Sequence, residues 1–192
     1  GVQVAVVVGA GNIWRGRQGL SMDRVRADHM GMLATVINAL AIQDAFISVG
    51  IDTVVMSAVE MNAFCEQYTR RDAVRALERG KVVVFGCGTG NPFFSTDTGA
   101  VLRAAEIGAD VILMAKNIDG VYTADPHKDP SAEKLSETTY DHILSEHLGV
   151  IDMTAASLAM DNSIPLYIFG LNDPENIYRV AKGERIGTKV VK

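Results

Sequence analysis

A glycine-rich loop followed by hydroxyl and carboxylate side chains is the part of the sequence best suited to chemistry. Glycines alternate with other residues at positions 86, 88 and 90, and residues 95–98 read Ser-Thr-Asp-Thr. Glycine lets the backbone approach a ligand closely, and the N–H groups at a helix start favour phosphate. We therefore expect residues 86–98 to bind a nucleotide or a phosphorylated metabolite. The alternative is a capped helix after a tight turn, since Ser, Thr and Asp are also common N-caps.

A second loop, residues 9–16, reads Gly-Ala-Gly-Asn-Ile-Trp-Arg-Gly. Its small residues can form a backbone nest for an anion, and Arg15 can clamp phosphate oxygens in bidentate fashion. The loop matches neither the Walker pattern nor the full dinucleotide fingerprint. Asp28, further along the chain, can accept bonds from ribose hydroxyls, or it can be an ordinary carboxylate on the surface of a helix.

A third cluster of polar side chains spans residues 116–126. Lys116 can reach phosphate, and Tyr122 can offer a flat face to a base. Asp119 and Asp125 can bond the edges of a sugar or base, although Asp-Gly at 119–120 is also a common turn. Each of the three loops follows a predicted strand, and ligands of parallel sheets bind beyond the carboxyl ends of the strands. We therefore expect the three loops to share a pocket.

The elements that must position these loops follow from runs of Val and Ile without polar alternation, which are typical of strands covered on both faces. We expect strands at residues 2–8, 53–57, 81–85, 110–115, 165–169 and 188–191. We expect helices at residues 22–49, 70–79, 98–107, 140–146, 154–160 and 174–181. This alternation predicts an α/β fold, a three-layer αβα sandwich with a mainly parallel central sheet. Residues 125–137 are interpreted as a polar excursion.

The bulk composition excludes several classes of protein. The chain has 192 residues, 48% of them hydrophobic and 21% charged, which predicts one globular domain over residues 1–192. A net charge of −5 argues against a nucleic-acid-binding protein. Cys65 and Cys87 have no partners at metal-ligand spacing, so we expect neither a disulfide framework nor a zinc site, and a cytoplasmic location. No apolar run reaches the length expected of a membrane span, so we expect no membrane association.

The predicted helix at residues 22–49 is longer than a small domain needs, at roughly 40 Å. Residues 30–42 are apolar nearly all round. Such a helix must be covered on two sides, by its own sheet and by something else. We hypothesise a subunit interface on this helix; the alternative is a central helix buried within one chain.

The order of the three loops, together with residues 28–35 (Asp-His-Met-Gly-Met-Leu-Ala-Thr) and 160–165 (Met-Asp-Asn-Ser-Ile-Pro), resembles the amino acid kinase family, and within it the bacterial uridylate kinase branch. The resemblance covers essentially the whole chain, and residues 88–97 are its most specific part. It implies transfer of phosphate from ATP to UMP, giving UDP and ADP. It also implies a homohexamer built as a trimer of dimers, with GTP and UTP as effectors.

The resemblance also implies roles for individual residues. It places UMP against Ala10, Asp28, Thr89, Gly90, Asn91, Pro92, Phe93, Phe94, Ser95 and Thr96. It places ATP against Gly11, Arg15, Lys116, Tyr122 and Asp125. Asp97 would be the catalytic carboxylate, acting as an organiser of cations rather than as a strong base. No protein side chain is expected as a dedicated metal ligand, because Mg²⁺ would be held mainly by phosphates and water.

The sequence departs from the family pattern in four places. The family begins with a strand bearing Lys-x-Ser-Gly-Glu, whereas this sequence opens with Gly-Val-Gln-Val and leads directly into a buried-type strand. We therefore expect a single domain that lacks its N-terminal strand and phosphate-binding lysine segment. Ala10 stands where the family usually has glycine. The loop at residues 15–22 is shorter than expected, and Lys116 stands where relatives often carry Thr or Asn.

Three other functions are compatible with parts of this pattern. A kinase of the same fold can act on carbamate, aspartate or acetylglutamate, but it would need a different acceptor loop from residues 90–94. A non-catalytic nucleotide sensor or storage protein on the same scaffold would bind UMP without turnover. A dinucleotide-dependent oxidoreductase is disfavoured by the incomplete fingerprint.

Overall fold

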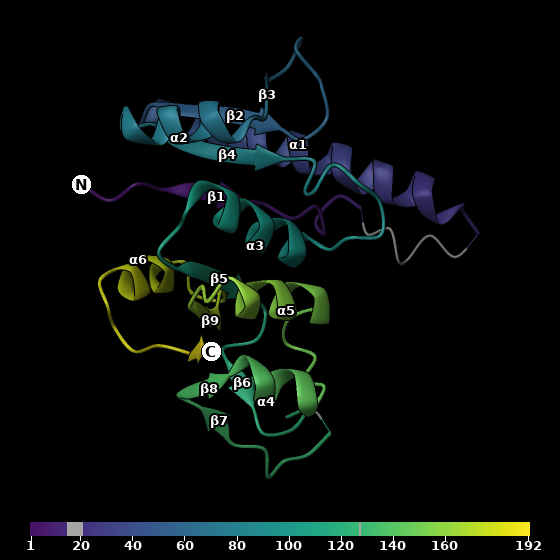
Figure 1. The fold of residues 1–192 in the computed structure, drawn as a ribbon, viewed down its shortest axis with the longest axis vertical. Coiled ribbons are helices and arrows are strands. Elements are labelled where there is room, and N and C mark those ends of the chain that lie inside the picture. Colours follow the sequence, from purple (N-terminus) through teal and green to yellow (C-terminus); the bar gives the residue numbers. More distant parts are fainter. Residues whose placement is uncertain (15–20, 127) are drawn as a thin grey trace. The chain divides into compact units, whose positions relative to one another are not determined.

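The computed structural model describes residues 1–14, 21–126 and 128–192 (Figure 1). The chain divides into two compact units, residues 1–100 and 101–192. The first unit contains β1 (Ala5–Val7), α1 (Arg24–Ser48), β2 (Thr53–Ser57), β3 (Glu66–Gln67), α2 (Arg70–Glu78), β4 (Val82–Gly86) and the start of α3 (Thr96–Ile107). The second contains the rest of α3, β5 (Ile112–Lys116), β6 (Val121–Tyr122), β7 (Lys134–Leu135), β8 (Glu137–Thr139), α4 (Tyr140–Ser145), α5 (Met153–Asp161), β9 (Leu166–Gly170), α6 (Glu175–Ala181) and β10 (Thr188–Val191).

The sheet of the first unit has the strand order β1-β4-β2-β3, with every pair parallel. All five residues of β2 are buried, as the unbroken apolar run predicts for a central strand covered on both faces. Because β1 and β4 are parallel neighbours, the loops that follow them leave the same edge of this sheet. That edge carries the first loop and the glycine-rich loop.

Helices cover both faces of this sheet. On one face, Ala39 of α1 packs with Val55 and Val84, and a Cβ on Gly86 would lie 3.1 Å from the Val36 side chain. Strand side chains alternate between faces, so Phe85 points to the other face, where it is also buried. Helix α2 contacts β4, and Figure 1 shows α1 and α2 on opposite sides of β2 and β4.

The sheet of the second unit has the order β5-β9-β10-β8. The pairs β5–β9 and β10–β8 are parallel, and β9–β10 is antiparallel. Its core joins residues from α3, α4 and α5 to the strands, including Val101, Tyr140 and Ile168. The Tyr140 hydroxyl donates to the carbonyl oxygen of Ile164 at 2.6 Å, so this buried polar group is satisfied.

The predicted α/β class, with mainly parallel strands flanked by helices, is confirmed. The strands expected in one sheet are hydrogen-bonded in two four-stranded groups. Residues 125–137, interpreted as a polar excursion, contain one short strand that was not expected, because Lys134–Leu135 pairs antiparallel with Val121–Tyr122, and Glu137 begins β8. Strands of two or three residues carry too little periodicity to be recognised locally. The α3 helix begins at Thr96, two residues earlier than expected.

The expectation that no segment is long and apolar enough to cross a membrane is also wrong. Helix α1 meets both requirements, and 22% of its most apolar segment is buried. A core helix of a water-soluble domain passes the same test. Within the first unit, α1 packs one side against β2 and β4.

Candidate nucleotide-binding site

The loop between β4 and α3, residues 87–95, is called the glycine loop below. Cys87, Gly88, Gly90 and Phe93 have positive φ angles of 61°, 55°, 85° and 73°. The amide of Gly90 donates to the carbonyl oxygen of Cys87 at 2.9 Å, which closes a tight turn. A Cβ on Gly90 would also lie 3.2 Å from Ala58, so both its conformation and its surroundings favour glycine. Four residues of the loop therefore have a left-handed backbone conformation.

Asp28 ties the tip of the glycine loop to α1. Its Oδ2 accepts a hydrogen bond from the backbone N–H of Phe93 at 2.8 Å and another from Arg24 Nε at 2.8 Å. The Arg24 guanidinium also lies 5.5 Å from the centre of the Phe93 ring, within the range of a cation–π contact. Phe93 is 61% exposed and Phe94 is 52% exposed. Both rings remain accessible to a ligand.

The glycine loop ends in a capped helix. The Ser95 hydroxyl accepts from the Thr98 amide at 3.1 Å, and the Ser95 carbonyl accepts from Gly99 at 3.1 Å. A Cβ on Gly99 would lie 3.3 Å from the Cα of Gly88, so α3 packs directly on the loop. Asp97, half-buried, occupies the first turn. The capping alternative and the phosphate-binding interpretation are compatible, because a capped N-terminus still presents its positive dipole end.

The first loop, defined as residues 9–16, also lies near the start of α3 in its described part, residues 9–14. The amides of Ile13 and Trp14 both donate to the carbonyl oxygen of buried Ala10, at 2.8 Å each. Asn38 of α1 donates to the Gly9 carbonyl at 2.7 Å. A Cβ on Gly9 would lie 3.6 Å from the Thr96 hydroxyl, so this loop lies beside the start of α3.

In the first unit, Asp28 of α1 thus bonds the glycine loop, and the first loop, which includes Ala10 and Gly11, lies beside the start of α3, where Asp97 occupies the first turn. Arg15, expected at phosphate, lies outside the described residues.

The third cluster lies in the second unit, after β5. Tyr122 donates its hydroxyl to Asp119 Oδ1 at 2.8 Å, and Lys134 Nζ bonds Asp119 Oδ2 at 3.0 Å. Partial burial raises the pKa of Asp119, but the bonds from Lys134 and Tyr122 outweigh it and lower that pKa overall. The bond to Asp119 raises the pKa of Tyr122. Asp119 therefore holds the Tyr122 hydroxyl and the Lys134 ammonium group together.

The remaining residues of this cluster lie on the same stretch of chain. The carbonyl oxygen of Lys116, the last residue of β5, accepts from the Leu171 amide at 2.7 Å. Asp125 is exposed and lies 3.5 Å from Lys128 Nζ. Two backbone amides, those of Lys128 and Asp129, donate to its carbonyl oxygen at 2.9 Å each. Lys116, Tyr122 and Asp125 thus form one polar stretch of the second unit.

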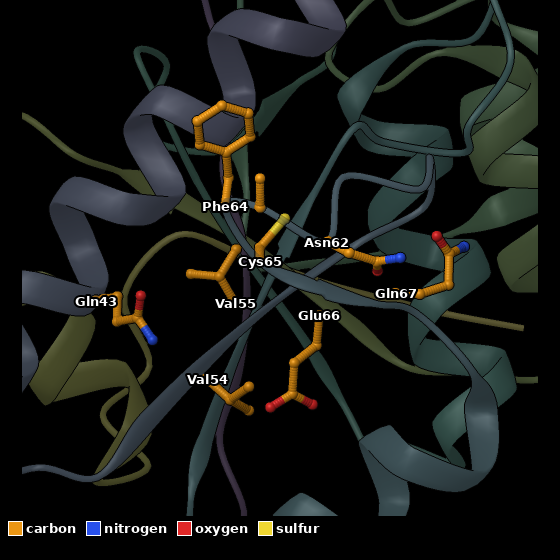
Figure 2. A pocket seen from close by; sticks show the side chains of 9 residues that line it. Gln43, Val54, Val55, Asn62, Phe64, Cys65, Glu66 and Gln67 are labelled. Atoms are coloured by element: carbon orange, nitrogen blue, oxygen red, sulfur yellow. The ribbon is translucent and has the colours of Figure 1, made fainter.

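A separate cavity of about 570 Å³ lies in the first unit, and Figure 2 shows Phe64, Cys65 and Glu66 around it. Burial raises the pKa of the Cys65 thiol. The residues that line the cavity are Gln43, Val54, Val55, Asn62, Ala63, Phe64, Cys65, Glu66 and Gln67. None of the predicted nucleotide contacts is among them.

Across the described ranges, no group of three or more His, Cys, Asp or Glu side chains is arranged to hold a metal ion.

Sequence reasoning missed the residues that hold the loops. Thr35 and Asn38 of α1 bond the glycine loop and the first loop, and Thr188 bonds the turn before Tyr122. One signal was available, because Asp28 and Thr35 are seven residues apart and so lie on the same side of a helix.

Comparison with known proteins gives a consistent result. Residues 1–170 match the Amino acid kinase family. A UMP kinase from Bacillus anthracis is 37% identical with a TM-score of 0.94, over 99% of this chain and 80% of that chain. A UMP kinase from Ureaplasma parvum is 39% identical with a TM-score of 0.92, over 98% and 82%. A uridylate kinase from Archaeoglobus fulgidus is 33% identical with a TM-score of 0.76, over 98% and 85%.

Proposed function

The chain belongs to the amino acid kinase family, and we infer that it is a UMP kinase, which transfers the γ-phosphate of ATP to UMP and yields UDP and ADP. The observation that carries this inference is the near full-length similarity to two UMP kinases, at 37% and 39% identity. The family match spans both units, which supports treating residues 1–192 as one kinase domain.

The acceptor nucleotide is assigned to the first unit. UMP would contact Ala10, Asp28 and residues 89–96, where left-handed turns and the start of α3 present backbone N–H groups to an anion. The exposed rings of Phe93 and Phe94 can cover the base. Hydrogen bonds to the base edge would select uracil, since a mismatched edge leaves a buried group unpaired at about 1–3 kcal/mol.

The donor nucleotide is assigned to Gly11, Arg15, Lys116, Tyr122 and Asp125. The bond from Tyr122 to Asp119 supports this assignment, because it holds the ring in one orientation for contact with a base. Lys116 and Arg15 supply positive charge for the phosphates.

Phosphoryl transfer needs in-line positioning and charge neutralisation more than covalent help from the protein. Asp97, in the first turn of α3 and close to the glycine loop, is assigned as the carboxylate that organises cations at the transferring phosphate. Mg²⁺ would neutralise the developing charge while bound mainly to phosphates and water.

We extend the proposal to assembly and location. The exposed apolar side of α1, with Met30, Leu33 and Ile37, supports self-association. The homohexamer, a trimer of dimers, and regulation by GTP and UTP rest on the family resemblance. A cytoplasmic location is supported by the sparse cysteine content.

The test is UDP formation by the full chain with ATP, Mg²⁺ and UMP, measured beside UMP binding by calorimetry. Turnover with UMP but not with aspartate, carbamate or acetylglutamate is expected. Binding of UMP without turnover would instead indicate a nucleotide sensor. Turnover with another of these acceptors and none with UMP would reassign the substrate within the family.

A further inference from the structure

We propose that Thr35, on α1, is a positioning residue for UMP, whose hydroxyl sets the conformation in which the glycine loop leaves the sheet. This inference rests on the proposed UMP kinase function. It begins from one hydrogen bond between residues far apart in the sequence. The backbone N–H of Cys87 donates to the Thr35 hydroxyl oxygen at 2.8 Å, and that hydroxyl donates to the carbonyl oxygen of Met32 at 2.6 Å.

The bond forms at the point where the sheet ends. The β2–β4 pairing stops at Ser57 and Gly86, so Cys87 is the first residue beyond the ladder. Its backbone N–H lies in the interior, where Cys87 is 1% exposed and Thr35 is 7% exposed. A buried N–H without an acceptor is costly, because water cannot replace the lost partner. The Thr35 hydroxyl therefore replaces a strand neighbour at this position.

The same residue begins the left-handed part of the loop. Cys87 and Gly88 have consecutive positive φ angles of 61° and 55°. A residue with a Cβ rarely adopts this conformation unless its surroundings hold it there. The anchored amide fixes Cys87, and Gly88 then lies against Gly99 at the start of α3. Loss of the anchor would release the residues directly before the predicted UMP contacts.

The chemistry of the side chain is specific. Thr35 must accept from Cys87 and donate to Met32 at the same time, which a hydroxyl does and a methyl group does not. Valine has nearly the same shape as threonine, so Thr35→Val removes the two bonds without opening a cavity. Thr35→Ser keeps the hydroxyl and removes only the methyl group.

The experiment compares the full chain with Thr35→Val and Thr35→Ser by steady-state kinetics. For Thr35→Val we expect KM for UMP to rise about tenfold, with KM for ATP close to wild type. For Thr35→Ser we expect both constants close to wild type.

Thr53→Val is the matched control, because Thr53 is also a buried threonine of the first unit. Its hydroxyl donates to the carbonyl oxygen of Ile51 at 3.0 Å, away from the loop. Equal impairment of the serine and valine variants, or an unchanged KM for UMP in Thr35→Val, would overturn the proposal.

Amide hydrogen exchange gives a second readout that does not depend on activity. In the wild type, the Cys87 amide is expected to exchange slowly, and in Thr35→Val about tenfold faster, with the Val84 amide unchanged. If the wild-type Cys87 amide exchanges as fast as that of exposed Asn91, there is no anchor, whether or not the valine variant folds. If the wild type makes no UDP from UMP, the proposed function fails, while protection of Cys87 still tests the anchor.

Discussion

At the scale of single residues, the polar side chains near the predicted UMP site mostly hold backbone rather than point at one another. Asp28 accepts a hydrogen bond from the amide of Phe93, and Ser95 accepts one from the amide of Thr98. This arrangement suits phosphoryl transfer, in which preorganised donors and cations do most of the work. Asp97 is the one described carboxylate at this helix start to which we assign a role in the reaction itself.

Asp97→Asn is expected to lower kcat on the order of 100-fold, with binding of UMP and ATP largely kept, because the change removes a charge at the transferring phosphate and little volume. Steady-state kinetics and calorimetry measure the two effects. Asp110→Asn, an exposed position just beyond the other end of α3, is the control. Unchanged turnover in Asp97→Asn would remove this residue from the mechanism.

Asp28→Ala is expected to raise KM for UMP about tenfold and KM for ATP much less, because the amide of Phe93 loses its acceptor and the loop tip is released. Asp28→Asn keeps one oxygen that can accept from this amide, so a smaller rise is expected. If Asp28→Ala weakens both nucleotides equally, its role is in folding and not in UMP binding.

At the scale of elements, α1 is the scaffold of the proposed acceptor site. Thr35 and Asn38 follow Asp28 by seven and ten residues, so all three lie on one side of the helix. Asp28 bonds the tip of the glycine loop, Thr35 bonds its start, and Asn38 bonds the first loop. In the second unit, β10 has the corresponding role. Buried Thr188 accepts from the amide of Val121 at 2.8 Å and donates to the carbonyl of Leu135. It thereby fixes the turn before Tyr122.

Thr188→Val is expected to raise KM for ATP several-fold, by about 1 kcal/mol of lost positioning, with KM for UMP near wild type. This is the reverse of the pattern expected for Thr35→Val, so the two valine variants control for each other. Thr188→Ser should restore the wild-type value. A rise in KM for UMP alone would contradict the assignment of this turn to the donor nucleotide.

At the scale of the whole molecule, the other side of α1 is unpartnered within the described residues. Met30, Leu33 and Ile37 are 39%, 50% and 58% exposed, and at ~100° per residue they lie opposite the side that anchors the loops. A second subunit that packed on this surface would contact the side of α1 that faces away from the loops. The proposed interface and the proposed acceptor site would therefore share one helix, α1.

Ile37→Glu is expected to shift the protein toward smaller species in analytical ultracentrifugation without detergent, because a charge on the apolar surface disfavours a buried interface. Gln3→Glu, which adds the same charge at an exposed position outside α1, is the control. A wild-type protein that sediments as a monomer at micromolar concentration would refute the interface. Recovery of the wild type only in the membrane fraction would favour a membrane role for α1.

The elements that a reader of the sequence can find are those with a strong local pattern. The Val-rich runs at β2 and β4 and the long α1 helix were located within about two residues, which is the usual uncertainty of element ends. The glycine loop was recognisable because glycines permit positive φ angles and the Ser-Thr-Asp-Thr run is typical of a helix start. The two-residue strands and the split into two sheets were not, because pairing partners lie far along the chain.

The chemistry of the loops, the parallel α/β class and the identity of the family were therefore readable before folding, since they depend on residue types and short-range periodicity. The hydrogen bonds that anchor these loops could not be predicted from the sequence. Thr35 and Cys87 are 52 residues apart, Asp28 and Phe93 are 65 apart, and Val121 and Thr188 are 67 apart. Each pair meets only when helix and strand pack, because a hydrogen bond requires its two atoms within about 3 Å and no local pattern encodes that distance.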